Sequence, residues 1–446
     1  MSRPRIAVIG AGISGLGAAW HLRQQAQVTV FEADGRFGGH ANTVDLTLEG
    51  VTHGVDTGFL VYNERTYPQL IALFAELGVE TAASDMSFSV QAPRAGGGRL
   101  EWSGSNLDSV FADRRNLLRP GFLGMLADIL RFNRVCTALA REGDEAALAE
   151  PVGAFLQRLG FGTPFRDGYL LPMIGCIWSC PTEQMLAFPV ATLIRFCHNH
   201  GLLQVADRPQ WFTVKGGSRQ YVERLLSHLP DCRRGMPVLS VDRGLRQGDP
   251  VTVHTAAGAE TFDAVILACH SDQALGLLSQ PTAAEQQVLG AIRYQPNTAV
   301  LHTDASLLPT RRKAWAAWNY ERAADLPREQ TAVCLHYLLN RLQPLPWQTP
   351  VIVSLNPVRE PRPETVARRI DYAHPVFDQA AIAAQSQLPL IQGVGGLWYC
   401  GAWTGYGFHE DGLKSGRAVA RALLDRHALL QGGTPPLAEP PMRRAA

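Results

Sequence analysis

The sequence has no long apolar run and almost no net charge. Across its 446 residues we find no stretch of about 18 uninterrupted apolar residues, so a membrane-spanning helix is not expected. Lysine and arginine number 41 against 40 aspartates and glutamates, a balance that argues against nucleic acid as the main partner. No internal repeat stands out either.

The eight cysteines follow no recognisable metal or disulfide pattern. The first apolar run begins at Ile6, which leaves no room for a secretory leader, so we expect reduced thiols and a cytoplasmic protein. Cys176 and Cys180, with His198 nearby, suggest a metal site, but their spacing fits no standard zinc pattern. Buried apolar thiols are the favoured interpretation, and no metal is predicted.

Three glycines near the beginning of the chain have G-x-G-x-x-G spacing. Gly10, Gly12 and Gly15 lie between the apolar run 6–9 and an Ala/Leu-rich, helix-like segment. Gly10 would make the tight turn, Gly12 would let a pyrophosphate approach the backbone, and Gly15 would let helix and strand pack closely. The start of such a helix offers unpaired N–H groups and partial positive charge to phosphates.

An acidic residue lies where a dinucleotide-binding unit needs one. Glu32 ends a second strand-like run, 28–31, about twenty residues beyond the glycines, where a carboxylate can accept both ribose hydroxyls. Strand, glycines, helix, strand and acid occur in this order, which is more specific than three glycines alone. The sequence therefore predicts a dinucleotide-binding unit.

Hydrophobic patterning predicts further elements along an apolar chain (46%) long enough for two or more domains. Residues 67–77 indicate a helix, 85–90 an alternating strand, and 106–199 a mostly helical region. The other predictions are a glycine turn and helix over 214–226 with a cap at Ser218, a β-meander over 237–262, strands at 263–269 and 396–400, and a final helix over 412–427.

A second glycine-rich segment, 400–416, opens the final helix. Together with E-A-x-x-R-x-G-G at 32–39 and D-T-G-F at 56–59, it resembles the FAD-dependent amine oxidase and phytoene desaturase superfamily. Within that superfamily, G-G-H-A-N-T and G-F-H-E-D-G-L-K-S-G are most similar to bacterial predicted NAD/FAD-binding proteins. That set is similar to the oxidase-like N-terminal domain of plant cyclopropane fatty acid synthases.

The resemblance implies an α/β fold with two interleaved domains. One is a Rossmann-like FAD-binding domain, with a parallel sheet and the β-meander, and the other is an α+β substrate-binding domain. We assign the FAD-binding domain to 1–80, 214–290 and 392–430, the substrate-binding domain to 81–213 and 291–391, and a flexible Gly/Pro-rich tail to 431–446.

FAD is the cofactor that the resemblance implies, and the matching positions give the residues expected to contact it. His40 departs from the pattern, because many relatives carry arginine or lysine there. Val238 matches the meander residue whose backbone reads the adenine. The full set is Gly10, Gly12, Ile13, Ser14, Gly15, Glu32, Ala33, Arg36, Gly38, Gly39, His40, Thr57, Gly58, Phe59, Val238, Gly401, Gly412 and Leu413.

The resemblance also implies aromatic side chains beside the flavin. In amine oxidases two rings flank the substrate amine; Tyr406 and Phe408 match one position, and Tyr372 is the candidate for the opposing ring. Many of these enzymes also hold a water with a lysine, but the corresponding stretch 292–299 contains none. This departure counts against simple amine oxidation.

Catalytic candidates follow directly in the chain. We name Tyr406, His409 and Glu410, with His409 slightly favoured as the base because the ordinary histidine pKa suits neutral pH. The alternative is a helix N-terminus capped by Asp411, with Glu410 in solvent.

Three functions remain in competition. The leading hypothesis is an FAD-dependent oxidoreductase that removes hydrogen from an apolar substrate, with a fatty acyl chain of membrane lipid implied by the resemblance. The second is a flavin amine oxidase, and the third is a non-catalytic lipid-binding protein on the same fold, like the guanine-nucleotide dissociation inhibitors of small GTPases. The oligomeric state stays open.

The segment 114–134 is both apolar and basic. Phe122, Leu126, Ile129 and Leu130 have helical spacing, and arginines flank them. Such a helix can lie on an anionic membrane, which would make the protein peripheral on the inner face of the membrane. The same stripe also fits a helix packed on its own core.

Overall fold

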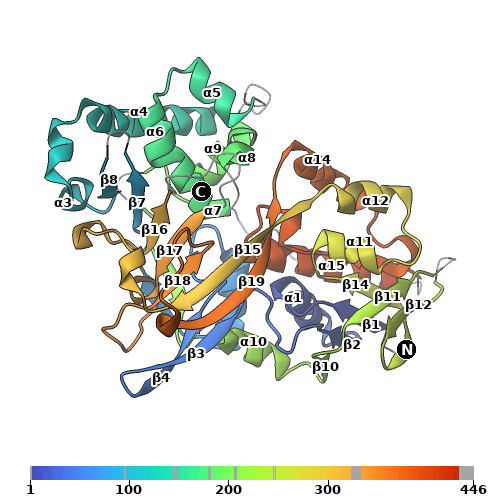
Figure 1. Cartoon of the computed structure of the whole chain (residues 1–446). Helices are drawn as coiled ribbons and strands as arrows, with labels where there is room; N and C mark the ends of the chain where they lie inside the picture. Colours follow the sequence, from blue (N-terminus) through green and yellow to red (C-terminus); the bar gives the residue numbers. More distant parts are fainter. Residues whose placement is uncertain are drawn as a thin grey trace.

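The computed structural model describes residues 3–94, 97–143, 148, 150–178, 182–204, 208–244, 246, 248–322 and 333–430. These residues form two lobes, and Figure 1 shows the helices of 106–199 gathered in the lobe opposite the first strands. The tail predicted at 431–446 lies outside the described residues.

A five-stranded parallel sheet forms the centre of the first lobe. Its strands come from three separate parts of the chain, and α1 (Ile13–Leu22) follows the first of them directly. Strands buried on both faces are typical of such sheets. The order is β10 (Asp231–Arg233), β2 (Gln27–Phe31), β1 (Arg5–Ile9), β14 (Ala264–Leu267) and β20 (Leu397–Tyr399), which confirms the predicted Rossmann-like unit.

Smaller sheets and helices complete this lobe. The predicted meander is present as β11 (Val238–Asp242), β12 (Val251–Thr255) and β13 (Gly258–Phe262). A further sheet pairs β5 (Tyr62–Asn63), β9 (Trp211–Val214) and β6 (Thr81–Ser84), and a hairpin of β3 (Thr43–Leu48) and β4 (Val51–Asp56) extends beneath the second lobe (Figure 1). The helices are α2 (Pro68–Leu77), α10 (Arg219–Leu226), α11 (Ser271–Leu277), α12 (Ala283–Gly290), α14 (Gln379–Gln387) and α15 (His409–Leu430).

The second lobe contains a seven-stranded mixed sheet. Its order is β19 (Val366–Val376), β15 (Arg293–His302), β18 (Ile352–Leu355), β17 (Cys334–Leu338), β16 (Trp318–Glu321), β7 (Phe88–Pro93) and β8 (Arg99–Ser103). The long strands β15 and β19 cross the middle of the molecule (Figure 1). The helices are α3 (Leu107–Val110), α4 (Pro120–Glu142), α5 (Val152–Arg158), α6 (Thr163–Phe165), α7 (Leu171–Trp178), α8 (Thr182–Leu186), α9 (Val190–Asn199) and α13 (Leu339–Leu342).

Three local predictions need correction. The strand expected at 85–90 begins at Phe88, because the Asp85 carboxylate accepts hydrogen bonds from the backbone and hydroxyl of Ser87 and makes a turn. Ser218 precedes α10, yet its hydroxyl donates to Asp56 instead of capping the helix. The final helix begins at His409, three residues earlier than expected.

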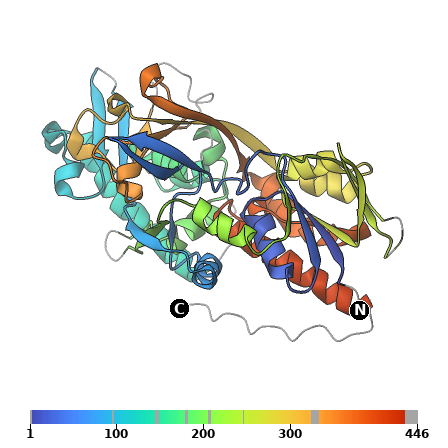
Figure 2. The same cartoon turned by 90° about the horizontal axis from the view of Figure 1, so that it is seen from below.

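The last helix packs directly on the first, with α15 beside α1 in Figure 2. A Cβ atom on Gly412 would lie 2.8 Å from the Ser14 hydroxyl oxygen, and one on Gly416 would clash with the Ser14 carbonyl. On the other helix, a Cβ on Gly17 would meet the Leu413 side chain at 2.5 Å. These glycines let both ends of the described chain meet beside the glycine turn.

Candidate active site

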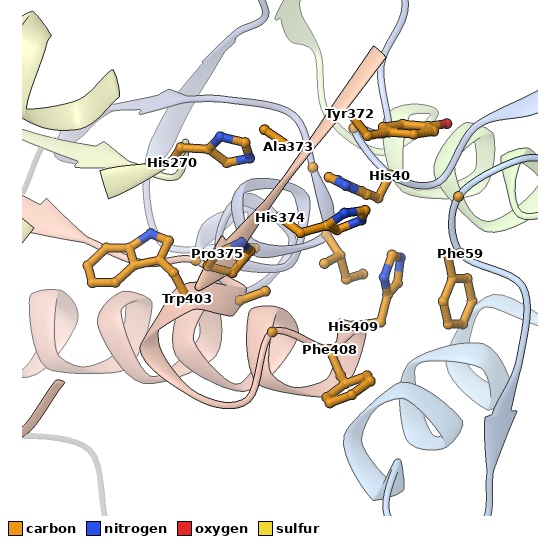
Figure 3. A pocket seen from close by; sticks show the side chains of 18 of the residues that line it. His40, Phe59, His270, Tyr372, Ala373, His374, Pro375, Trp403, Phe408 and His409 are labelled. Atoms are coloured by element: carbon orange, nitrogen blue, oxygen red, sulfur yellow. The ribbon is translucent and has the colours of Figure 1, made fainter. Parts of the chain in front are cut away.

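A cavity of about 970 Å³ extends between the two lobes. Its walls come from the turn after β1, the end of β2, strand β19, the segment before α15 and helices α7 and α9. Figure 3 shows the central part, where the rings of His40, His374 and His409 lie close together.

The glycine turn leaves room for a ligand beside the backbone. A Cβ on Gly12 would meet no atom within 4 Å, whereas one on Gly10 would lie 2.9 Å from the Ala268 carbonyl oxygen. Gly10 has a φ of 104°, a conformation that favours glycine. Ile13 and Ser14 line the cavity in the first turn of α1, where N–H groups lack intrahelical partners. The turn therefore fits a phosphate group.

The end of β2 provides the carboxylate that a ribose needs. Glu32 and Ala33 line the cavity, and Val238 of the meander lines the same end. The two Glu32 oxygens accept hydrogen bonds from the backbone N–H of Ala11 at 2.9 Å and of Asp34 at 2.8 Å. These bonds fix the carboxylate close to the glycine turn.

The next part of the wall carries a neutral histidine. Arg36 donates to the Gly39 carbonyl oxygen at 2.7 Å, and both residues line the cavity. The His40 ring stacks on Tyr372 with centroids 4.9 Å apart, and its Nε2 has no hydrogen-bond partner among the described residues. Burial, followed by the nearby His374, lowers the pKa of His40 well below its usual value. His40 is thus a neutral polar group.

Most residues predicted to contact the cofactor line the cavity. They are Gly10, Gly12, Ile13, Ser14, Glu32, Ala33, Arg36, Gly39, His40, Gly58, Phe59, Val238 and Gly401. The residues that lie outside the described lining are Gly15, Gly38, Thr57, Gly412 and Leu413.

These five residues support the site from behind its wall. A Cβ on Gly15 would clash with the Gly10 carbonyl, so Gly15 serves the close packing of helix and strand. Gly38 occupies a turn with a φ of 111°. The Thr57 hydroxyl donates to the Asn42 carbonyl, while Gly412 and Leu413 pack on α1.

His409 lines the cavity but does not have the properties of a base at neutral pH. Its ring stacks on Phe59 with centroids 3.8 Å apart, and its Nε2 is 2.9 Å from the Tyr221 hydroxyl. Burial lowers the pKa of His409 to about 3, so its affinity for a proton is weak. The expectation of a base with an ordinary pKa is therefore wrong.

Glu410 points away from the site. Its carboxylate accepts hydrogen bonds from the backbone N–H groups of Gln69 and Leu70, both at 2.9 Å, at the beginning of α2. Asp411 accepts from the N–H groups of Tyr406 and Phe408, each at 3.0 Å, and so closes the turn before α15. The catalytic role predicted for Glu410 is corrected to a structural one, and it is not in open solvent.

The aromatic candidates separate into two places. Tyr406 and Phe408 line the cavity and pack on Phe196, with Phe408 stacked at 5.1 Å and Tyr406 edge-on at 6.2 Å. Tyr372 also lines the cavity, but it contacts the rings of His40 and His374, and its hydroxyl accepts a hydrogen bond from Asn42 at 2.9 Å. Tyr372 therefore lies beside His40 and His374 and not beside Phe196.

Sequence reasoning missed three cavity histidines, His200, His270 and His374. His270 stacks on Tyr294 at 4.3 Å, and His374 Nδ1 is 2.8 Å from the side-chain nitrogen of Asn297. The only local signal was the two-residue spacing of Tyr372 and His374, which places both on one face of a strand.

A family model described as flavin containing amine oxidoreductase matches residues 13–316. The chain belongs to this family. The enzyme is therefore an FAD-dependent oxidoreductase.

Matches to individual curated relatives cover less of the flavoenzyme than the family model does. Coproporphyrinogen III oxidase of Propionibacterium freudenreichii subsp. freudenreichii is 31% identical over 201 residues, which is 41% of this chain and 33% of the relative. The chain spans a third or less of the curated relatives it matches.

Solved structures share the whole fold. Cyclohexylamine oxidase of Brevibacterium oxydans superposes with a TM-score of 0.66 and 16% identity, covering 96% of this chain and 100% of that one. A fatty acid isomerase from P. acnes that produces CLA gives 0.66 and 15%, covering 95% and 99%.

The flavoenzyme has a strongly aromatic chamber at the far end of its cavity. His200 lies there, stacked on Phe196 at 3.9 Å, and burial lowers the pKa of His200 to about 4. The other described residues of this end are Met86, Phe88, Met173, Cys176, Ile177, Trp178, Leu202, Trp211, Trp318 and Tyr337. We call this set with His200 and Phe196 the aromatic chamber.

Only one group among the described residues brings ligand atoms close enough to hold a metal: Glu321, Cys334 and His336. Glu321 is already paired with Arg99 at 2.6 Å, Arg359 at 3.2 Å and His336 at 3.0 Å. This ion-pair network accounts for the cluster. Cys176 is buried in α7, while Cys180 lies outside the described residues.

Proposed function

We propose that this flavoenzyme removes hydrogen from a fatty acyl chain of a membrane lipid, desaturating or oxidising it. The observation that carries the proposal is the uncharged aromatic chamber. Among the described residues of the chamber there is no aspartate, glutamate, lysine or arginine, and the pKa of His200 is too low for a charge at neutral pH. The transfer of an apolar chain from water to such a surface lowers the free energy.

The described residues of the chamber would bind and orient the substrate. The chemistry that FAD would supply when bound is the acceptance of a hydride from a substrate carbon. His409 Nε2 is held by the Tyr221 hydroxyl and its ring by Phe59, so this side chain forms a fixed wall. The apolar chamber excludes water from the reacting end, which protects a reactive carbon from side reactions.

Amine oxidation is the main alternative. Three acidic residues line the cavity: Glu32 and Asp34 lie at the nucleotide end, and Asp371 is exposed and accepts a hydrogen bond from Thr298. An ammonium group in the aromatic chamber would therefore lack a counterion among the described residues. The missing lysine in 292–299 points the same way.

Porphyrinogen oxidation is a second alternative, favoured by the match to coproporphyrinogen III oxidase. A porphyrinogen carries carboxylates, and carboxylates bind best to arginine or lysine. The described residues of the chamber offer neither.

A surface next to the chamber supports delivery of the substrate from a membrane. Helix α4 packs on α9, which contributes Phe196 to the chamber. The predicted stripe is only partly exposed, because Phe122 is buried while Leu130 is 55% exposed. Other leucines extend the exposed surface, which we call the leucine surface: Leu107, Leu117, Leu118, Leu123 and Leu130.

Cations surround the leucine surface. Arg114 and Lys313 pair with Asp108, and Arg115 pairs with Asp113, but all three cationic side chains stay more than half exposed. Apolar side chains beside cations bind anionic lipid surfaces. No helix among the described residues is long and apolar enough to cross a bilayer, so this contact would be peripheral.

Lipid profiling tests the substrate. Cells without the protein should lose an unsaturated or oxidised acyl species, and the purified enzyme should reduce its flavin with the corresponding lipid. Oxygen consumption with a panel of amines and with coproporphyrinogen covers the alternatives. An unchanged lipid profile together with turnover of an amine would overturn the acyl assignment.

Liposome flotation tests the leucine surface. We expect the protein to float with anionic vesicles, and the double variant Leu117→Ser/Leu118→Ser or Arg114→Ala/Arg115→Ala to float less. Leu390→Ser is the matched control, because Leu390 is 66% exposed elsewhere. Equal flotation of all variants, or none with the wild type, would contradict membrane docking.

A further inference from the structure

His374 occupies the centre of the cavity on β19, and a chain of side-chain amides determines its hydrogen bonding. The chain begins at the backbone of β15. Thr298 donates its N–H to the side-chain oxygen of Asn356 at 2.9 Å, and Asn356 returns its own N–H to the Thr298 carbonyl at 2.8 Å. The oxygen of the Asn356 amide is therefore identified, because a backbone N–H can only donate.

The next amide follows from the first. The NH₂ group of Asn356 donates to the Asn297 side-chain oxygen at 2.7 Å and to the Val333 carbonyl at 3.2 Å. The NH₂ group of Asn297 then donates to the Gln295 carbonyl at 3.0 Å. Two backbone carbonyls and one backbone N–H thus fix the orientation of both amides.

The last link fixes the histidine. The Asn297 NH₂ group lies 2.8 Å from His374 Nδ1, so Nδ1 must accept and cannot carry a proton. The proton of the neutral ring is then on Nε2. An imidazolium would bring two donors together, in agreement with the burial that lowers the pKa of His374 to about 4.

Nε2 is left to serve a ligand. His374 lines the cavity and remains partly accessible, and no described residue is hydrogen-bonded to its Nε2. We propose that His374 is an uncharged hydrogen-bond donor of fixed tautomer that binds an acceptor atom of the flavin or of the substrate. Such a group recognises a carbonyl oxygen or an unprotonated nitrogen and gives no attraction to an ammonium. The tautomer and the flavin as acceptor do not depend on the acyl substrate, whereas the substrate as acceptor rests on the proposed function.

The tautomer is tested by ¹⁵N spectra of the histidine side chains in the holoenzyme. The His374 signal is assigned by its loss in His374→Gln, and we expect the Nε2–H pattern at neutral pH. Asn297→Asp replaces the donor by an acceptor, so His374 should then carry a proton on Nδ1. A wild-type His374 that is protonated on Nδ1 would overturn the proposal.

Two further measurements identify the acceptor. His374→Leu removes the donor, His374→Gln keeps an N–H near the Nε2 position, and His254→Leu is a surface control. A reduction potential that shifts in His374→Leu without substrate, and recovers in His374→Gln, assigns the acceptor to the flavin. Palmitate binding is followed by flavin absorbance. If binding is roughly tenfold weaker in His374→Leu and is restored in His374→Gln, the acceptor atom belongs to the substrate. If Leu and Gln behave alike in both measurements, the donor role is wrong.

Discussion

Two interior sites of this enzyme hold histidines in opposite surroundings, one around His374 and His409 in the cavity and one around His336 and Glu321. In the cavity, burial lowers the pKa of His409 to about 3 and of His374 to about 4, and neither ring is hydrogen-bonded to a described carboxylate. On strand β17, inside the second lobe, burial also favours neutral His336, but the Cys334 sulfur and the Glu321 carboxylate together raise its pKa to about 9. Burial alone therefore does not decide the charge of a histidine; its neighbours do.

The two groups contribute to stability in opposite pH ranges. A raised pKa means that the folded state holds its proton more tightly, so the contribution of His336 is complete below about pH 6.5 and is lost as pH rises through about 9. A lowered pKa has the opposite effect on how stability changes with pH. The contribution of His374 and His409 is present above about pH 6.5 and is lost as pH falls toward their folded values.

The largest loss of stability should come from removing the Glu321 carboxylate, which pairs with His336. Glu321→Gln leaves the buried His336 and the partly buried Arg99 without an anion, and we expect a loss of about 3 kcal/mol in the free energy of unfolding. Glu360→Gln is the matched control, because the Glu360–Arg369 pair is exposed and such pairs contribute about 1 kcal/mol or less. Urea unfolding measures both, and equal losses would remove the distinction between the groups.

The alkaline range tests the charge of His336 directly. Wild-type stability should decline between about pH 7 and 10, and this decline should be much smaller in Glu321→Gln, which lacks the anion that holds the proton. The difference between the two proteins, followed as the urea midpoint against pH, isolates this histidine from other groups that titrate there. Parallel curves would mean that Glu321 is not the group that holds the proton on His336.

A smaller effect is expected in the cavity. His409→Leu leaves the buried Tyr221 hydroxyl without its partner, at a cost of about 1–2 kcal/mol near neutral pH. The decline of stability from about pH 6 to 4 should become shallower in this variant, because one lowered pKa has been removed. Tyr221→Phe is the comparison that breaks the same bond but keeps the histidine. If it flattens the acid range equally, His409 is not the group that titrates.

The smallest expected effect is none. His374 and His409 are neutral well above their pKa values of about 4 and about 3, so the visible spectrum of the bound flavin should stay constant from about pH 5.5 to 8. A spectral transition near pH 6.5 that disappears in His374→Gln or His409→Leu would show that one cavity histidine titrates normally.

Local motifs explain why the fold of the first lobe could be predicted. The glycine turn, α1 and Glu32 are contiguous, and each residue has a role that short-range geometry dictates. Element ends were less predictable, since they depend on single side chains. Asp411 stabilises the turn before α15, and the turn at Asp85 makes β7 begin at Phe88.

The site was less predictable because its decisive contacts are distant in sequence. Glu410 follows His409 directly and looked catalytic, but its partners Gln69 and Leu70 lie at the start of the second helix. His374 is held by Asn297 across two strands, which no local pattern reveals. The cavity residues near the amino-terminal glycines were predictable because they are close together in the sequence.

The contact between α15 and α1 also bears on how this enzyme is made. The parallel sheet needs β20, and the wall of the glycine turn needs α15, so the last part of the described chain completes what the first part begins. At roughly 5–20 residues per second, a ribosome needs roughly 20–90 s to translate 446 residues. We therefore expect tight capture of FAD only after α15 has left the ribosome and packed on α1.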